Sequence, residues 1–124
     1  MRESLNIGFH LSFFGGVMRS ELLYQADLIT KLQKLFPMAF VLKMPPKEFQ
    51  GIPDILILFR DRWAMLEVKR SSNSEIQPNQ AYYIDVFNRM SFAAFIYPEN
   101  EKQVLDDLQS AFGTYRKTCS IKSK

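Results

Sequence analysis

The segment GIPDILILFRDRWAMLEVKR, residues 51–70, contains two short apolar runs separated by a charged triplet. The runs Ile55–Phe59 and Trp63–Val68 predict two neighbouring strands, and the triplet at 60–62 predicts the tight turn between them. Both faces of these strands are apolar, so we expect helices to cover both sides of the sheet. The segment therefore predicts the central hairpin of an α/β domain.

The charged residues at the open end of this hairpin share one face, because side chains alternate along a strand with a period of two. A turn centred on Arg60-Asp61 places Asp54 opposite Glu67, and a turn centred on Asp61-Arg62 places it opposite Lys69. Two neighbouring carboxylates repel each other and raise each other's pKa unless a cation lies between them. A divalent metal with hard oxygen ligands is the natural occupant. The pattern therefore predicts a metal site.

These residues carry a family resemblance. Gly51-Ile52-Pro53-Asp54 followed by Glu67-Val68-Lys69 resembles the motif of the PD-(D/E)xK nuclease superfamily. With Gln80 opening the next helix, the pattern is similar to the small phage-type, VRR-NUC-like members, which are Holliday-junction-resolvase-like. The resemblance covers residues 19–113 and implies a restriction-endonuclease-like core.

The resemblance also implies roles for individual residues. Asp54 and Glu67 would hold Mg²⁺ together with the main-chain carbonyl of Val68, and Mn²⁺ would substitute for it. Lys69 would position or activate the attacking water. DNA would be the partner, and a phage or prophage origin would place the protein in the cytoplasm of a bacterial host.

A helical stripe precedes the hairpin. Residues 20–36 place apolar side chains at helical spacing, with Ser20 as the expected N-cap and Pro37 as the expected stop; the stripe consists of Leu28, Leu32, Leu35 and Phe36. Towards the N-terminus the same stripe reaches Gln25 and then Glu21, two polar residues on the face that should be buried.

Glu21 has two interpretations. It could be a favourable charge near a helix N-terminus. Alternatively, it could reach the metal cluster, with Gln25 supporting it from one turn away, since a buried carboxylate is costly unless it is paired or metal-bound. The resembling family has a glutamate on this helix, so we choose Glu21 over Asp27, which lies off the stripe.

A second helix is expected over Pro78–Met90, because proline suits the first helical turn. Its apolar stripe consists of Tyr83, Ile84 and Phe87. Gln80 lies at the head of this helix and could simply hydrogen-bond loop backbone. The motif favours a contact of Gln80 with Lys69, a metal-bound water or a phosphate, with Gln77 as the alternative residue.

The remaining segments complete one α/β domain of order α-β-β-β-α-β-α with a mixed sheet of about four strands. A first strand is expected over 38–43, followed by a loop over 44–53. A buried strand over 92–97 should run parallel to 63–69 through a right-handed crossover. A last helix is expected to open at Pro98 and Glu99 and to end at Gly113; its core face consists of Val104, Leu105, Leu108 and Phe112.

The formal net charge of +3 comes from the C-terminal end of the chain. Four of the sixteen basic residues lie in 114–124, which has no acidic residue, so residues 1–113 carry about −1. This basic tail could contact phosphates or simply be solvated. The candidates for nucleic-acid contacts are Lys43, Lys47, Arg70, Arg116 and Lys117, with Arg70 expected on the opposite face from Lys69.

Residues 1–17 form an N-terminal extension to the expected nuclease domain, 18–113. Apolar and polar residues alternate strictly over 5–13, which suits an edge strand or a dimer contact. An over-called start, with translation beginning at Met18, is an equal alternative.

Composition excludes several chemistries. His10 is the single histidine, so nucleophilic catalysis through a Ser-His or Cys-His pair has no base in the rest of the chain. The single Cys119 excludes an intramolecular disulfide and a thiolate zinc cluster, and it fits a reducing cytoplasm. No Gly-rich phosphate loop indicates a nucleotide cofactor, and no segment approaches the length of a membrane span.

The sequence therefore favours a magnesium-dependent endonuclease that hydrolyses DNA phosphodiester bonds and selects branched, nicked or flapped DNA by shape. A homodimer cutting a branched junction is the specific form expected. The alternative is a non-catalytic nucleic-acid-binding protein with a nuclease-like fold, and a third hypothesis is an RNA-cleaving or toxin-like nuclease. The complete motif set favours catalysis.

Overall fold

The computed structural model describes the backbone of residues 16–45 and 50–122 and the side chains of residues 20–45 and 50–113. The expected order of helices and strands is confirmed. The elements are α2 (Gly16–Leu35), β1 (Phe40–Lys43), β2 (Ile55–Phe59), β3 (Arg62–Val68), α3 (Pro78–Met90), β4 (Phe92–Ile96) and α4 (Glu101–Lys122).

The four described strands form one mixed sheet in the order β1-β2-β3-β4. β2 is antiparallel to both β1 and β3, whereas β4 is parallel to β3, as expected for a strand reached through α3. The hairpin pairs Phe59 with Arg62, so its turn is Arg60-Asp61, with Arg60 at a positive φ of 59°. This is the first of the two predicted registers, and it aligns Asp54 with Glu67.

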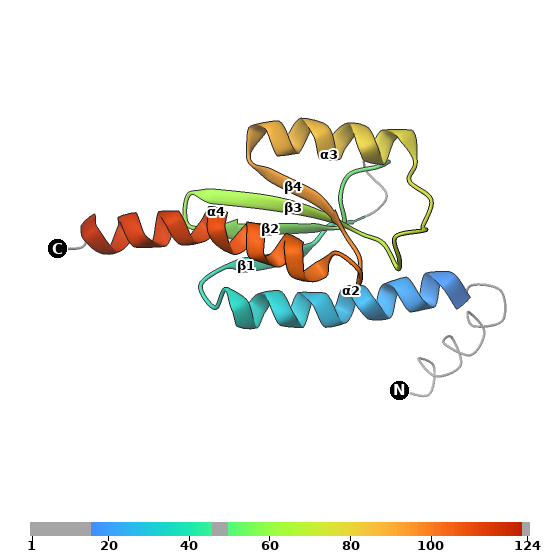
Figure 1. Cartoon of the computed structure of the whole chain (residues 1–124), viewed down its shortest axis with the longest axis horizontal. Coiled ribbons are helices and arrows are strands. Elements are labelled where there is room, and N and C mark those ends of the chain that lie inside the picture. The colour runs from blue at the N-terminus through green and yellow to red at the C-terminus, as the bar shows by residue number, and fades with distance from the viewer. Residues whose placement is uncertain (1–15, 46–49, 123–124) are drawn as a thin grey trace.

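Helices cover both faces of the sheet: α3 lies on one face and α2 and α4 lie on the other (Figure 1). The main core lies on the face covered by two helices. Alternate strand residues such as Ile55, Ile57 and Leu66 pack there against Leu32 of α2 and Leu108 of α4, and all five are 0% exposed. The predicted apolar stripes of α2 and α4 therefore mark the correct core-facing sides.

The other face is covered less completely. Phe87 of α3 packs edge-to-face on Trp63 and stacks on Tyr83, with ring centroids 6.0 and 5.7 Å apart. No residue of α3 is fully buried, so the predicted stripe is only half-buried. The buried Ala93 of β4 lies under this helix, and its small side chain allows a close approach.

Several predicted helix and strand ends differ from the structure. α2 begins at Gly16, so Ser20 lies inside the helix and is not its N-cap. No proline interrupts residues 16–19, and serine is tolerated within a helix. The helix also extends two residues across the expected domain boundary at Met18.

The predicted end of the last helix at Gly113 was also wrong. α4 continues through Gly113 to Lys122, because a single helical glycine costs only about 1 kcal/mol and no proline follows it. Its start is Glu101, three residues after Pro98. β1 and β4 are each shorter than predicted, and residues 1–15 and Lys47 lie outside the described part of the chain.

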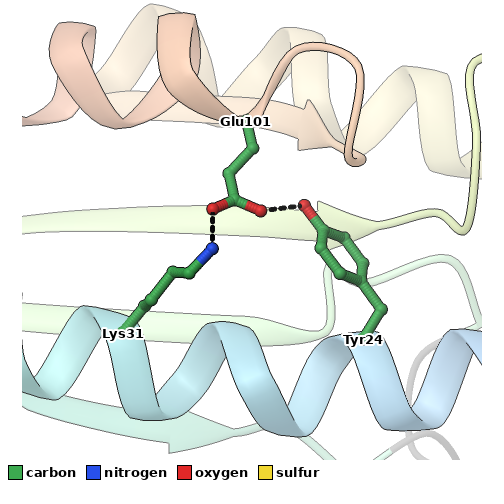
Figure 2. Close-up of polar contacts among 3 residues, drawn as sticks. All are labelled: Tyr24, Lys31 and Glu101. Carbon is green, nitrogen blue, oxygen red and sulfur yellow. Dashed lines mark hydrogen bonds and ion pairs between the residues drawn. The ribbon is translucent and has the colours of Figure 1, made fainter.

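A polar contact ties α2 to α4 (Figure 2). Glu101 accepts a hydrogen bond of 2.8 Å from the Tyr24 hydroxyl and a second, ion-paired one from Lys31. Burial alone would raise the pKa of Glu101, but these two hydrogen bonds lower it below its ordinary value. Burial and the neighbouring Glu101 charge raise the pKa of Tyr24, so Tyr24 remains the donor.

We expect Tyr24→Phe to lower the free energy of unfolding by about 1–2 kcal/mol at neutral pH, because it removes a hydrogen bond to a charged group. A carboxylate with a lowered pKa stabilises the fold above its ordinary pKa of 4.5, and this stabilisation is lost as the pH falls. The difference from the wild type should therefore shrink in acid. Denaturant unfolding at several pH values would measure it, with the exposed Tyr82→Phe as the matched control.

Candidate active site

Asp54 and Glu67 come together at one end of the hairpin. The Asp54 Oδ2 atom accepts a hydrogen bond of 2.9 Å from the Val68 backbone N–H. Glu67 is only 4% exposed, and its carboxyl group is close enough to Asp54 for a side-chain hydrogen bond. The predicted carboxylate pair is therefore present, and both members lie on the face that carries α3.

The nearby lysines only partly offset the burial and mutual repulsion of these two acids. Burial, followed by the Asp54 charge, raises the pKa of Glu67 to about 8, although Lys69 opposes the increase. Burial also raises the pKa of Asp54, against the lowering effects of the Val68 N–H, Lys69 and Lys43. Both carboxyl groups therefore hold a proton more tightly than free acids do. A cation would replace this proton.

Pro53 limits the backbone hydrogen bonding of the strand end next to the two carboxylates. The pairing of Ile55 with Leu66 places Pro53 opposite Val68 in the extended register. Because proline has no N–H, it cannot donate the hydrogen bond that a strand partner would give to the Val68 carbonyl. The Val68 N–H, in turn, is bound by the side chain of Asp54. Pro53 therefore removes a backbone donor that could otherwise bind the Val68 carbonyl, the expected main-chain metal ligand.

Lys69 is held on the same face by α3 and the loop before it. Its Nζ atom donates to the Gln80 Oε1 atom and to the Glu75 carbonyl, both at 2.9 Å, and the side chain is buried. The other half of the Gln80 amide, Nε2, donates to the Glu67 Oε2 atom at 2.9 Å. Gln80 therefore connects Glu67 to Lys69, and the predicted contact of Gln80 with Lys69 is confirmed.

Gln77, the alternative to Gln80 in the sequence prediction, lies at the start of α3 and contacts Gln80 itself. It is the N-cap of α3, and its backbone N–H donates to the Gln80 Oε1 atom at 3.0 Å. The same oxygen therefore accepts from Gln77 and from Lys69. This shared acceptor fixes the Gln80 amide, so that its N–H groups point towards Glu67.

Glu21 approaches the pair from α2. Burial raises its pKa, and the charges of Lys69 and Asp54 act on it with opposite signs. The Arg70 backbone N–H hydrogen-bonds to Glu21 and lowers its pKa again, as does the Arg70 charge. Both Lys69 and Arg70 therefore act on Glu21. Gln25, one turn along α2, is 5% exposed.

The candidate metal ligands among the described side chains are two carboxylates rather than three. Among residues 20–45 and 50–113, no three His, Cys, Asp or Glu side chains are arranged so that they could hold one ion. Asp54 and Glu67 are the carboxylate pair, and Glu21 stands further off, within electrostatic reach. Mg²⁺ is commonly held by one or two carboxylates and keeps several waters, so this donor set fits it.

Only part of the predicted nucleic-acid surface is described. Lys43 of β1 lies close enough to Asp54 for its charge to lower the pKa of that residue. Arg116 and Lys117 belong to the last turns of α4, although their side chains lie outside the described part. One contributor to the site escaped the sequence prediction. It is the Glu75 carbonyl, which accepts from Lys69 and which no side-chain pattern could mark.

The sequence has no match among family models and none among curated proteins. Among solved structures, the chain is similar to a VRR_NUC domain, with a TM-score of 0.56 and 19% sequence identity. The likeness covers 70% of this chain and 95% of that domain. The chain has a VRR-NUC-like nuclease fold.

The VRR-NUC-like fold agrees with the motif resemblance of Asp54, Glu67 and Lys69, because the observed hairpin brings these three residues together at one end. None of the helices in the described part of the chain has the length and apolarity to cross a bilayer.

Proposed function

We propose that this VRR-NUC-like protein is a magnesium-dependent endonuclease that hydrolyses DNA phosphodiester bonds. The observation that carries the proposal is the pair of the half-buried Asp54 and the buried Glu67, with Lys69 held beside it by Gln80. Such an arrangement costs folding free energy as it stands, because burial raises the pKa of both acids. Perturbed acids gathered at one end of a sheet are typical of a functional site.

Asp54, Glu67 and the Val68 carbonyl would hold the metal. All three offer hard oxygen atoms, which suit Mg²⁺ and also Mn²⁺. When bound, the metal would lower the pKa of a coordinated water and stabilise negative charge on the phosphate oxygens. Glu21 would orient water from the α2 side or recruit a second ion, with Gln25 supporting its helix.

Lys69 would supply the remaining positive charge. Its ammonium group is positioned by the Gln80 Oε1 atom and the Glu75 carbonyl, so it loses little conformational entropy when a substrate arrives. We assign it to the attacking water or to the scissile phosphate. The charge of Lys43 acts on Asp54 and that of Arg70 acts on Glu21, so both would contact the DNA backbone near this position. Arg116 and Lys117 follow Ala111 in α4, whose carbonyl accepts from Arg62 at the turn end of the hairpin, so they would contact DNA away from the metal site.

The charge distribution supports the proposed substrate preference. Residues 1–113 are close to neutral, so a general polyanion surface is absent from the composition of that part. Selection of branched, nicked or flapped DNA by shape is consistent with such a small domain. We propose that a homodimer cuts such DNA, because two copies would present two sites to the two strands.

A non-catalytic nucleic-acid-binding protein with this fold is the second candidate. It would explain the fold and the basic C-terminal residues, but it gives no reason for placing two neighbouring acids with raised pKa values beside a lysine. The grouping of Asp54, Glu67, Lys69 and Gln80, with Glu21 within electrostatic reach, favours the nuclease.

The experiment is a cleavage panel with magnesium, manganese or EDTA on single-stranded, duplex, nicked, flapped and four-way DNA. We expect metal-dependent cleavage, fastest on one of the branched or interrupted duplexes. A mobility-shift assay in calcium, on the same substrates, would report binding separately. Binding without cleavage in either metal would establish the non-catalytic candidate, and preferential cleavage of added RNA would reassign the substrate.

A further inference from the structure

The first turn of α3 contacts both carboxylate-bearing segments through two consecutive residues. Gln80 donates to Glu67 on β3. Asn79 turns the other way, and its Nδ2 atom donates to the Gln50 carbonyl at 3.0 Å. Gln50 begins the short segment, residues 50–53, that leads directly into Asp54.

Gly51 permits this contact for two separate reasons. Its φ of +96° lies in the left-handed region, where side chains are strained. A Cβ atom at this position would also lie 2.7 Å from the Asn79 Cγ atom and 2.9 Å from its Nδ2 atom. The backbone of Gly51 therefore runs directly against the side chain of Asn79.

The segment 50–54 is fixed at its other end as well. Pro53 is among the fully buried residues. The Asp54 carbonyl accepts a hydrogen bond of 2.7 Å from the Met44 N–H, and the Asp54 carboxylate accepts from Val68. Asn79 provides the corresponding side-chain contact at the start of the segment. With both ends held, the Asp54 carboxylate has little freedom to move relative to Glu67.

We infer that Asn79 is a positioning residue for the metal site. Together, Asn79 and Gln80 fix the segment before Asp54 and the side chain of Glu67 to the same helical turn, and so set the separation of the two carboxylates. The inference rests on the proposed function, because it assigns Asn79 to the same site. Mg²⁺ demands near-ideal geometry, so a small displacement of one carboxylate reduces affinity. Loss of outer partners of metal ligands typically weakens metal binding about 10–100-fold.

The test is Asn79→Ala, with Asn88→Ala as a matched control on the same helix. Asn88 accepts a hydrogen bond of 3.1 Å from the Ala93 N–H at the far end of α3, so both variants lose one asparagine contact. Calorimetric titration with Mn²⁺ gives the binding constant, and cleavage against magnesium concentration gives the half-saturation point. We expect Asn79→Ala to weaken both about 10-fold, with the maximal rate at saturating metal nearly retained and Asn88→Ala unchanged in both.

Two further variants separate positioning from folding. Asn79→Asp keeps the size but removes the N–H donor, so it should also weaken metal binding, by less than Asn79→Ala because its added negative charge attracts the cation. Gly51→Ala should displace the Asn79 side chain sterically and weaken metal binding at least as much. Circular dichroism identifies any variant that fails to fold, and the comparison then rests on Asn79→Asp against Asn88→Ala.

Failure of the positioning role of Asn79 can be distinguished from failure of the proposed nuclease function. If the wild type binds Mn²⁺ and cleaves DNA but Asn79→Ala and Asn79→Asp bind metal as tightly, the positioning role is wrong and the proposed function stands. The same holds if Asn88→Ala loses metal affinity equally, because the effect is then one of general stability. If the wild type neither binds Mn²⁺ nor cleaves, the proposed function fails, and the positioning role fails with it.

Discussion

Asp54→Asn and Glu67→Gln should each abolish cleavage while leaving the metal-free protein at least as stable as the wild type. Metal affinity depends on the anionic oxygens, which both substitutions replace with a neutral amide. The loss should therefore appear in metal titration as well as in the cleavage rate.

The unchanged or increased stability has a structural reason. An amide oxygen at position 54 can still accept from the Val68 N–H, and an amide oxygen at position 67 can still accept from Gln80. Neither change leaves a cavity, because the side chains are nearly equal in volume. Removal of either charge also relieves the repulsion that raises the pKa of Glu67.

The sign of the pH dependence follows from the raised pKa. A carboxyl group whose pKa is 4.5 when unperturbed and about 8 in the folded protein takes up protons on folding. The free energy of unfolding therefore falls as the pH rises through this window. Glu67→Gln removes this loss, so its advantage over the wild type should be absent below pH 4.5, grow between pH 4.5 and about 8, and stay at its maximum above that. Each tenfold difference in proton affinity between the folded and unfolded states corresponds to about 1.4 kcal/mol.

Thermal melts from about pH 4 to about pH 9, with and without magnesium, would measure these differences. Asp61→Asn is the matched control, because it makes the same chemical change in the exposed turn at the opposite end of the same hairpin. It should alter neither cleavage nor the response to magnesium. If Asp54→Asn or Glu67→Gln unfolds the metal-free protein, the two acids are structural partners of the core and the metal-site interpretation is wrong.

The sequence predicted the hairpin and its functional face because both depend on local rules. Alternation with a period of two forces Asp54, Glu67 and Lys69 onto one face in either register, so an ambiguous turn did not affect that conclusion. The choice between the registers required the structure. Arg60 adopts a positive φ in the observed turn, a conformation that is uncommon for a residue with a long side chain.

The helix ends and the long-range contacts were harder to predict. Ser20 and Gly113 are statistically good helix ends, yet both lie within helices, because local propensities of about 1 kcal/mol are easily outweighed. The contact of Asn79 with Gln50 joins residues 29 positions apart, and the acceptor is a backbone carbonyl. Sequence periodicity carries no information about such a pair.

Lys69→Met should slow the chemical step on the order of 10²-fold or more, while metal binding and DNA binding persist. Its charge lowers the pKa of Glu67, Asp54 and Glu21, so removing it allows protons to compete better with the metal. The same removal eliminates repulsion between the ammonium group and the metal. Because these effects oppose each other, metal affinity should be compared above about pH 8, where proton competition weakens.

The role of Lys69 in chemistry can then be separated from its role in the fold. Methionine leaves the Glu75 carbonyl and the Gln80 Oε1 atom without the ammonium donor, which should lower the free energy of unfolding by about 1–3 kcal/mol. The control Lys102→Met changes a lysine whose side chain is 90% exposed on α4. Single-turnover cleavage at saturating metal and DNA, at a temperature where both variants are folded, isolates the chemical step. If Lys69→Met cleaves at the wild-type rate under these conditions, the ammonium group serves only to hold Gln80 in place, and the positive charge that assists the reaction must come from the metal alone.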